Sequence, residues 1–267
     1  MTKATLSGVI AAVATPVEPS GAPDIARATK LARYLLDNGC DGLNVLGTTG
    51  EATSFSLDER KRVMRAYRNA NLPMARLMVG TGAAALADAV ALARGAAELG
   101  FAGALVLPPF YYKGVPDDGL AAYIDALVRA TAQKPIPIYL YHFPQQSGLH
   151  WHVKLVRRLL DRFGARIVGL KDSSGDMAYA REHAGVPLRL DLDQAPAGAR
   201  RCDRHRPDSR GSRPAGADRR QGCAARQHGG AGGVQCERVS WSVASSAGSV
   251  ARIEQVKTGL SSEAAPS

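Results

Sequence analysis

The sequence has few of the side chains that build metal sites and redox centres. It contains four cysteines, and no two of them form a CxxC pair. A zinc site or a dithiol redox motif is therefore not expected, and reduced thiols in a cytoplasmic protein are the default interpretation. No GxGxxG motif follows the first predicted strand, which argues against a dinucleotide-binding sheet.

Long apolar runs and clusters of basic charge are also absent. No stretch is long enough to span a bilayer, and the short apolar segment 8–14 continues into Thr15-Pro16, which favours a buried strand over a signal sequence. The net charge of +10 is spread along the chain: residues 1–190 hold 22 Lys and Arg against 16 Asp and Glu, and residues 191–267 hold 12 against 8. Nucleic-acid binding requires a basic cluster or a motif, so we expect neither a nucleic-acid nor a membrane partner.

Between residues 8 and 186 the chain alternates between two patterns. Short apolar runs bounded by Gly or Pro predict strands that are buried on both faces. Between them, apolar positions three and four residues apart predict amphipathic helices, which end at Gly39, Gly100 and Gly164. The predicted strands are 8–14, 42–46, 77–80, 103–107, 136–141 and 167–171, and 188–193 is compatible with a seventh.

This alternation predicts an α/β fold with a parallel sheet. Six repeats of the unit favour a (β/α)8 TIM barrel over residues 1–190, with its active site at the carboxyl ends of the strands. The barrel is expected to be incomplete, because nothing after residue 193 resembles an eighth strand. Unpaired strand edges and an open core cost more than the ~5–15 kcal/mol by which domains are stable. We therefore expect the chain to fold poorly and to show little activity.

Residues 191–267 differ in composition from the rest of the chain. They contain one aromatic residue, Trp241, and eight Leu, Ile, Val, Met or Phe, whereas residues 196–230 alone carry nine arginines. A segment so poor in apolar residues cannot bury enough surface to fold. Two interpretations remain open: a disordered tail, which could bind RNA or an anionic surface, or a shift of reading frame near residues 190–195, since Arg-, Gly- and Ala-rich text is typical of GC-rich DNA read out of frame.

Lys171 is the most informative single residue. It ends the apolar run 167–170 and precedes a turn rich in Ser, Gly and Asp. A lysine at the end of a buried strand cannot easily reach water, and burial favours the neutral, nucleophilic amine that Schiff-base chemistry needs. The alternative is a lysine whose long side chain extends into solvent.

Three other predicted strand ends carry polar or aromatic groups. The second strand leads into Gly47-Thr48-Thr49-Gly50-Glu51, whose N–H groups and hydroxyls suit an anion, although such turns are common before helices. The fourth leads into Pro109-Phe110-Tyr111-Tyr112, a pattern also typical of packing or of a subunit contact. The fifth ends in Tyr141-His142-Phe143-Pro144, where Tyr141 could instead be a core tyrosine. In a barrel these ends meet at one mouth.

Together with Gly169-Leu170-Lys171-Asp172-Ser173-Ser174-Gly175, these motifs resemble the dihydrodipicolinate synthase / N-acetylneuraminate lyase family of class I pyruvate-dependent aldolases. The resemblance covers residues 5 to about 186. It implies that Lys171 forms an imine with pyruvate or another 2-oxo acid. It further implies that Tyr141 acts as general acid/base, that Thr48 relays the proton, and that Tyr111 completes the site of a neighbouring subunit. The substrate-binding residues that it implies are Gly47, Thr48, Thr49, Gly50 and His142.

The resemblance also implies a lyase that condenses or cleaves pyruvate and an aldehyde, assembled as a homodimer or homotetramer. No metal or organic cofactor is implied, because the lysine supplies the electrophile. Family members that make dihydrodipicolinate carry an arginine where this chain has Gln146, and glutamine cannot make a charged bidentate clamp. A dehydratase or aldolase of 2-keto-3-deoxy sugar acids is therefore the alternative, and a catalytically inactive, truncated member is another. His142 either contacts the variable half of the substrate or is a packed histidine.

The DNA that encodes the chain tests the frameshift hypothesis. We expect one of the two other reading frames downstream of codon 190 to encode an apolar run followed by a helical pattern. Translation of both frames checks this expectation, and a lack of strand and helix periodicity in both would contradict it.

Overall fold

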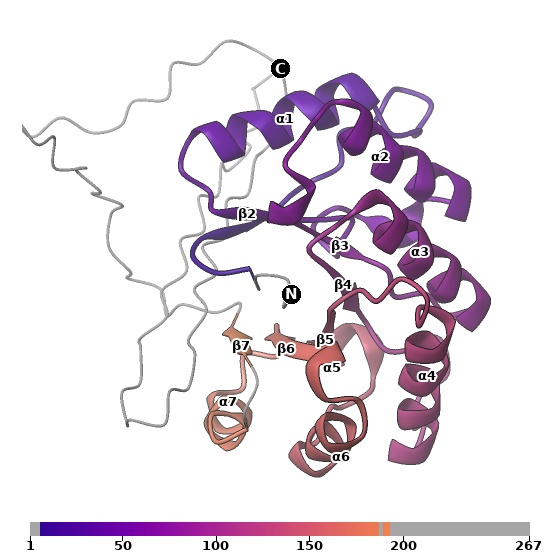
Figure 1. The fold of residues 1–267 in the computed structure, drawn as a ribbon, viewed down its shortest axis with the longest axis vertical. Coiled ribbons are helices and arrows are strands. Elements are labelled where there is room, and N and C mark those ends of the chain that lie inside the picture. Colours follow the sequence, from indigo (N-terminus) through magenta and orange to yellow (C-terminus); the bar gives the residue numbers. More distant parts are fainter. Residues whose placement is uncertain (1–5, 187–188, 193–267) are drawn as a thin grey trace, which may run out of the picture.

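A layer of parallel strands curls inside an outer layer of helices (Figure 1). The computed structural model describes residues 6–186 and 189–192. The strands are β1 (Ile10–Ala12), β2 (Gly42–Val45), β3 (Leu77–Gly80), β4 (Gly103–Val106), β5 (Ile138–His142), β6 (Ile167–Asp172) and β7 (Arg189–Leu192). They form a 7-stranded sheet in sequential order, and each neighbouring pair is parallel. This is the topology of a TIM barrel.

The prediction of an incomplete α/β barrel is confirmed for the described part of the chain. All six predicted strands and the compatible seventh are present, and within these residues no pairing joins β7 to β1. Residues 193–267, which include nearly all of the predicted tail, lie outside the described residues.

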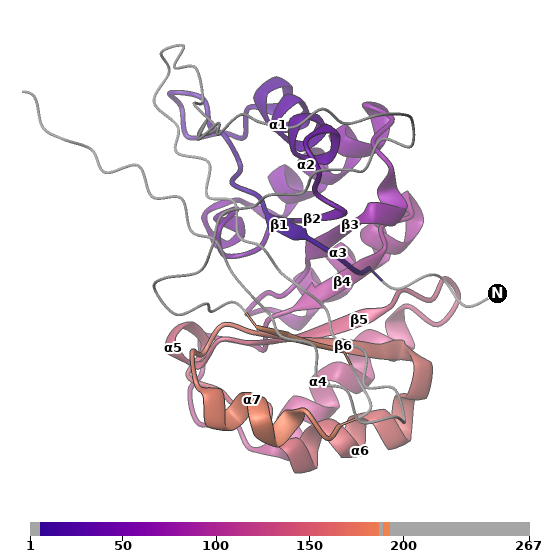
Figure 2. The ribbon, with the colours of Figure 1, turned by 90° about the vertical axis from the view of Figure 1, so that its left-hand side faces the viewer.

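Most helices lie on the convex side of the sheet (Figure 1), whereas the short α5 lies beyond the end of the strands (Figure 2). The α-helices are α1 (Ile25–Asp37), α2 (Leu57–Asn69), α3 (Leu86–Leu99), α4 (Asp117–Ala130), α5 (Pro144–Ser147), α6 (Val153–Phe163) and α7 (Met177–His183). Short 3-10 turns are η1 (Ala52–Ser54), η2 (Met74–Arg76) and η3 (Gly164–Arg166). Gly39, Gly100 and Gly164 mark the ends of α1, α3 and α6, as predicted. All three glycines have positive φ. No helix in the described ranges is both long enough and apolar enough to cross a membrane.

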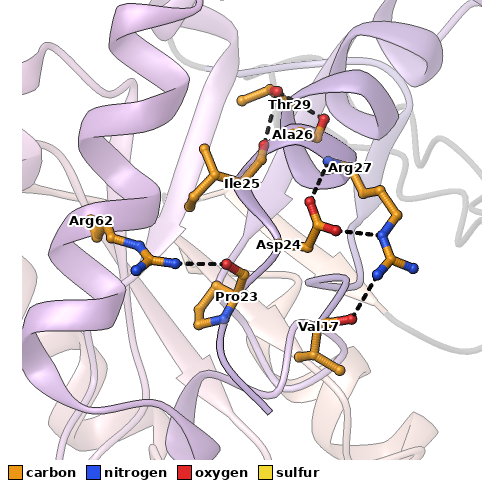
Figure 3. A network of polar contacts seen from close by, with 8 residues as sticks. All are labelled: Val17, Pro23, Asp24, Ile25, Ala26, Arg27, Thr29 and Arg62. Carbon is orange, nitrogen blue, oxygen red and sulfur yellow. Dashed lines mark hydrogen bonds and ion pairs between the residues drawn. The ribbon is translucent and has the colours of Figure 1, made fainter. Parts of the chain in front are cut away.

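The start of α1 shows how short-range polar contacts fix these elements (Figure 3). The Asp24 carboxylate accepts a hydrogen bond from the Arg27 backbone N–H at 2.9 Å, which caps the helix. The Arg27 guanidinium also donates to the Val17 carbonyl at 3.0 Å. From α2, Arg62 donates to the Pro23 carbonyl at 2.9 Å. These bonds hold the loop between β1 and α1 against both helices.

The buried apolar side chains form two cores, one on each face of the sheet. The larger core lies between strands and helices, and includes Ile138 and Leu140 of β5. The smaller core lies inside the curl, and includes Tyr139 and Tyr141 of the same strand. Side chains alternate between the faces of a strand, so β5 supplies both cores in turn.

The pairing of β5 with β6 shifts by one residue along its length. Ile138 pairs with Ile167, whereas Tyr139 pairs with Gly169, so the extra residue at 168 forms an irregularity of the β-bulge type. After the shift, Tyr141 pairs with Lys171. The bulge therefore decides which residue of β6 lies beside Tyr141.

Gly80, the last residue of β3, allows close approach of the loop that follows β2. A Cβ atom at this position would lie 1.9 Å from the Leu46 carbonyl oxygen and 3.2 Å from the Gly47 nitrogen. These contacts are with backbone, which cannot move aside as a flexible side chain can. Gly80 thus keeps the β2 loop pressed onto the end of β3.

We expect Gly80→Ala to destabilise the fold by about 2 kcal/mol or more, because the added methyl group clashes with backbone. Gly95→Ala in α3 is the matched control, since the nearest atom to its Cβ would be Met64 Cε at 3.8 Å. The control should be neutral or stabilise by up to ~1 kcal/mol, because alanine is the better helix former. Urea unfolding of both variants measures the difference, and equal stability of the two would contradict the expectation.

Candidate active site

Lys171 and Tyr141 lie side by side on the inner face of the sheet, where the pairing of β6 with β5 places them. Both are buried, with 3% and 4% of their surfaces exposed. The Lys171 amine donates a hydrogen bond to the Tyr141 hydroxyl at 3.4 Å, and its Nζ lies 4.4 Å from the centre of the tyrosine ring. The lysine therefore points toward the tyrosine inside the barrel and not along the surface into solvent.

Two further hydroxyl groups converge on the Tyr141 hydroxyl. Thr48 Oγ1 lies 3.3 Å from it, and Ser173 Oγ donates to it at 3.2 Å. Ser173 Oγ also accepts a hydrogen bond from Lys171 Nζ at 3.2 Å. The amine and three hydroxyls thus form one polar cluster, in which a proton can move between Lys171, Tyr141 and Thr48.

Ser173 was not among the site residues predicted from the sequence. Its backbone N–H donates to the His142 carbonyl at 2.8 Å, which extends the pairing of β6 with β5 by one residue. The Ser173 side chain therefore points to the same face as Lys171, two positions earlier, and reaches the cluster. The period of two along a strand was the signal that could have identified it.

The loop after β2 has an unusual backbone. Leu46 and Glu51 have positive φ values of 52° and 48°, and they flank the turn 47–50. Non-glycine residues rarely adopt this conformation, and such strain is often found at functional sites. Within the described residues, none of the four backbone N–H groups of the turn donates a hydrogen bond to another protein group. These donors are therefore available to an anion, and the predicted anion site at this turn stays a prediction.

A pocket of about 220 Å³ opens beside the cluster. Thr48 and Tyr141 are the cluster members that line it, and Gln146 lies in its wall. The full lining is Leu46, Gly47, Thr48, Ala52, Thr53, Arg60, Gly80, Gly82, Leu105, Leu107, Phe110, Tyr141 and Gln146. Within the described residues, no group of three or more His, Cys, Asp or Glu side chains is arranged to hold a metal ion.

Arg60 of α2 is the charged residue in this lining, and the sequence patterns did not single it out. It is 5% exposed, and its guanidinium donates to the Gly80 and Gly82 carbonyls at 2.9 and 3.2 Å. Burial lowers the pKa of Arg60 to about 10, which leaves the group charged near neutral pH. Arg60 therefore ties α2 to the end of β3, beneath the β2 loop.

His142, predicted from the resemblance as a substrate-binding residue, lies on the opposite face of β5 from Tyr141. Its ring stacks on Tyr179 of α7 at 3.9 Å, and its Nδ1 accepts a hydrogen bond from the Trp151 backbone N–H at 3.4 Å. Adjacent residues of a strand face opposite ways, so His142 packs in the outer core while Tyr141 enters the barrel. The alternative interpretation, a packed histidine, agrees with this geometry.

The remaining predicted residues occupy two different settings. Thr49 lies in the β2 turn but does not line the pocket. Tyr111 is 72% exposed in the loop after β4, where its ring meets that of Tyr112 edge-on at 5.1 Å. Tyr111 is not part of the cluster around Lys171 within this chain, so its predicted role in a neighbouring subunit stays a prediction.

The fold and the cluster together define a partial α/β barrel with a buried lysine at a strand end. The profile of the dihydrodipicolinate synthetase family matches residues 5–185, and the chain belongs to that family. It is 40% identical over 167 residues to a 4-hydroxy-tetrahydrodipicolinate synthase of Synechococcus sp. (strain WH7803), which covers 62% of this chain and 54% of that protein. An uncharacterized DapA-like lyase of Chloroflexus aurantiacus is 38% identical over 175 residues, covering 65% and 58%.

A solved structure shows the same fold. The crystal structure of dihydrodipicolinate synthase from Agrobacterium tumefaciens superimposes with a TM-score of 0.67 at 31% identity, and covers 69% of this chain and 65% of that chain. The chain thus spans little more than half the length of the curated relatives that it matches.

The environment of His142 predicts a pH dependence of stability. Burial, and then the positive charge of the neighbouring His150, lower the pKa of His142 from 6.5 to about 3. Between these two values the unfolded chain binds more protons, so stability is lost as the pH falls, by up to ~1.4 kcal/mol per pH unit. We expect His142→Asn, which lacks this titration, to lose less stability than the original chain between pH 7 and pH 5. Urea unfolding at both pH values checks this, and equal losses would contradict it.

Proposed function

We propose that Lys171 forms an imine with the keto carbon of pyruvate or another 2-oxo acid, and that the chain carries the reactive centre of a Schiff-base lyase. The convergence of the Lys171 amine, the Thr48 hydroxyl and the Ser173 hydroxyl on the Tyr141 hydroxyl supports this proposal. Imine formation needs a nucleophilic amine and a group that both takes and returns protons. Membership of the dihydrodipicolinate synthetase family supports the same chemistry.

The proposed reaction begins when Lys171 Nζ attacks the keto carbon and forms a carbinolamine. Tyr141 transfers a proton to the carbinolamine hydroxyl, which leaves as water and produces the protonated imine. The Tyr141 oxygen, now deprotonated, takes a proton from the adjacent methyl carbon, which gives an enamine and restores the Tyr141 hydroxyl. The enamine carbon then adds to the carbonyl carbon of an aldehyde. The aldehyde oxygen takes its proton from Tyr141, and hydrolysis of the imine releases the product and restores the amine. The reverse sequence is a retro-aldol cleavage.

The turn after β2 is proposed to hold the carboxylate of the 2-oxo acid. Its N–H groups have no acceptor within the described residues, and Thr48 brings the turn to Tyr141. Thr49 would add a hydroxyl to this anion site. No metal or organic cofactor is required in this scheme, because the protonated imine nitrogen withdraws the electrons.

A 2-keto-3-deoxy sugar acid is the second candidate substrate. Gln146 lines the pocket at the position where dihydrodipicolinate-forming relatives are expected to carry an arginine. An uncharged amide binds hydroxyl groups well but cannot form a charged bidentate pair with a second carboxylate. Gln146 thus favours a polyhydroxylated partner, cleaved by retro-aldol reaction or dehydrated. The products formed from such an acid distinguish the two reactions.

Assembly into a homodimer or homotetramer is part of the proposal. Tyr111 and Tyr112 present exposed rings at the barrel mouth, in the loop after β4. In the proposed assembly, Tyr111 would enter the site of the neighbouring subunit and extend the proton relay from Tyr141.

Borohydride trapping with pyruvate tests the reactive centre. Because Lys171, Tyr141 and Thr48 lie together in the described residues, we expect reduction to add a pyruvate-derived group to Lys171, in contrast to the little activity expected from the sequence alone. Peptide mapping identifies the adduct, and Lys171→Met should abolish it. Lys154→Met is the matched control, because Lys154 is an exposed lysine on α6. Tyr141→Phe should slow adduct formation by about 10²-fold or more, the usual contribution of a general acid/base.

The trapping experiment has a clear opposing result. A folded relative of the family, treated in parallel, shows that the reagents work. If that relative is labelled while the present chain is not, or if another lysine carries the adduct, the proposed function is wrong.

A further inference from the structure

Lys113 connects two loops at the mouth of the barrel. It lies in the loop between β4 and α4, and its ammonium donates to the Ser147 carbonyl at 3.1 Å and the Gln146 carbonyl at 3.4 Å, both at the end of α5. It also donates to the Phe110 carbonyl in its own loop. One cation thus holds three carbonyl oxygens from two segments of the chain, and charge makes each of these bonds stronger than a neutral one.

Gly148 at the end of α5 leaves the space that the Lys113 side chain occupies. Gly148 ends α5 in the left-handed conformation, with φ of 66°, and its N–H donates to the Pro144 carbonyl at 2.7 Å. A Cβ atom at position 148 would lie 2.6 Å from Lys113 Cδ. The aliphatic stem therefore crosses directly over the glycine, and the end of α5 is shaped to receive it.

The two loops joined in this way supply one side of the pocket. Phe110 comes from the loop after β4 and Gln146 from α5, and both line the pocket with Tyr141. Lys171 and Ser173 belong to β6 and the turn after it, and no contact that involves Lys113 reaches them within the described residues. Lys113 thus holds this wall without touching the Lys171 amine, and the contact that joins α5 to the turn after β6 is the hydrogen bond from the Gln145 side chain to the Ser174 carbonyl at 2.6 Å.

We propose that Lys113 is a positioning residue that fixes the Phe110 and Gln146 wall and thereby sets the binding of the second substrate. It takes no part in imine formation at Lys171. This inference rests on the proposed function for its kinetic consequence, whereas the clamp between the two loops does not depend on activity.

Lys113→Met tests the clamp, because it keeps the stem and removes the ammonium. We expect hydrogen exchange of the full chain to rise severalfold in residues 108–116 and 143–150, but not in β3 or α2. The KM for D-glyceraldehyde, used with pyruvate, should rise about tenfold, while the rate of borohydride trapping with pyruvate should change less than twofold. Lys113→Arg, which keeps a cation, should restore most of the KM, and Lys154→Met should match the original chain in every measurement.

Three results would overturn the inference. One is unchanged exchange in both loops of Lys113→Met. Another is raised exchange with an unchanged KM for glyceraldehyde. The last is a loss of trapping as large as the loss of aldehyde addition, which would show an effect on the whole site. If the original chain itself forms no adduct with pyruvate, the proposed function fails, and the exchange measurement still decides whether Lys113 joins the loops.

Discussion

The register between β5 and β6 is the constraint on which the candidate site depends. If the pairing of Ile138 with Ile167 continued without a shift, Leu170 would lie opposite Tyr141. The extra residue at 168 advances β6 by one position and brings Lys171 to that place instead. A one-residue slip in a strand reverses the face of every following side chain. The bulge therefore determines whether the Lys171 amine points into the barrel or into the helix layer. Only with this register does the amine join the cluster that Tyr141 forms with Thr48 and Ser173.

Contacts on the helix side of β5 hold the end of this strand, which carries Tyr141 on the other side. Trp151 is fully buried, and its indole N–H donates to the Tyr141 carbonyl at 3.0 Å. Its own carbonyl accepts from the Tyr179 hydroxyl at 2.7 Å, and lies 3.0 Å from the His183 ring. With His142 stacked on Tyr179, these bonds join the end of β5 to α7. Tyr141 is thus held by groups that lie on the opposite side of β5 from its own side chain.

Much of the fold could be predicted from the sequence, because apolar runs and helix-ending glycines are local signals. The grouping of Lys171, Tyr141 and Thr48 was also predictable, since the carboxyl ends of parallel strands meet at one mouth. The prediction listed His142 with the substrate-binding residues, whereas the structure places its side chain on the opposite face of β5 from Tyr141, as the alternation along a strand implies. Arg60, Lys113 and the bulge at 168 were not predictable, because their roles depend on backbone carbonyls and register, which leave no pattern in side-chain type. Apart from Phe110, which lies three positions from Lys113, the partners of Arg60 and Lys113 lie 20 to 34 positions away.

The division of the pocket has an evolutionary consequence. The turn after β2 is pressed onto Gly80 and the amine is fixed by strand register, so substitutions there disturb backbone. Phe110 contributes its side chain from the loop after β4 and Gln146 from α5, both outside the sheet, so an exchange there leaves the strands untouched. Under the proposed function, selection could therefore change the accepted partner by few mutations without altering the contacts of Lys171. A single ancestral barrel of this kind could give rise to enzymes that share the first chemical step and differ in the carbon skeleton that they accept.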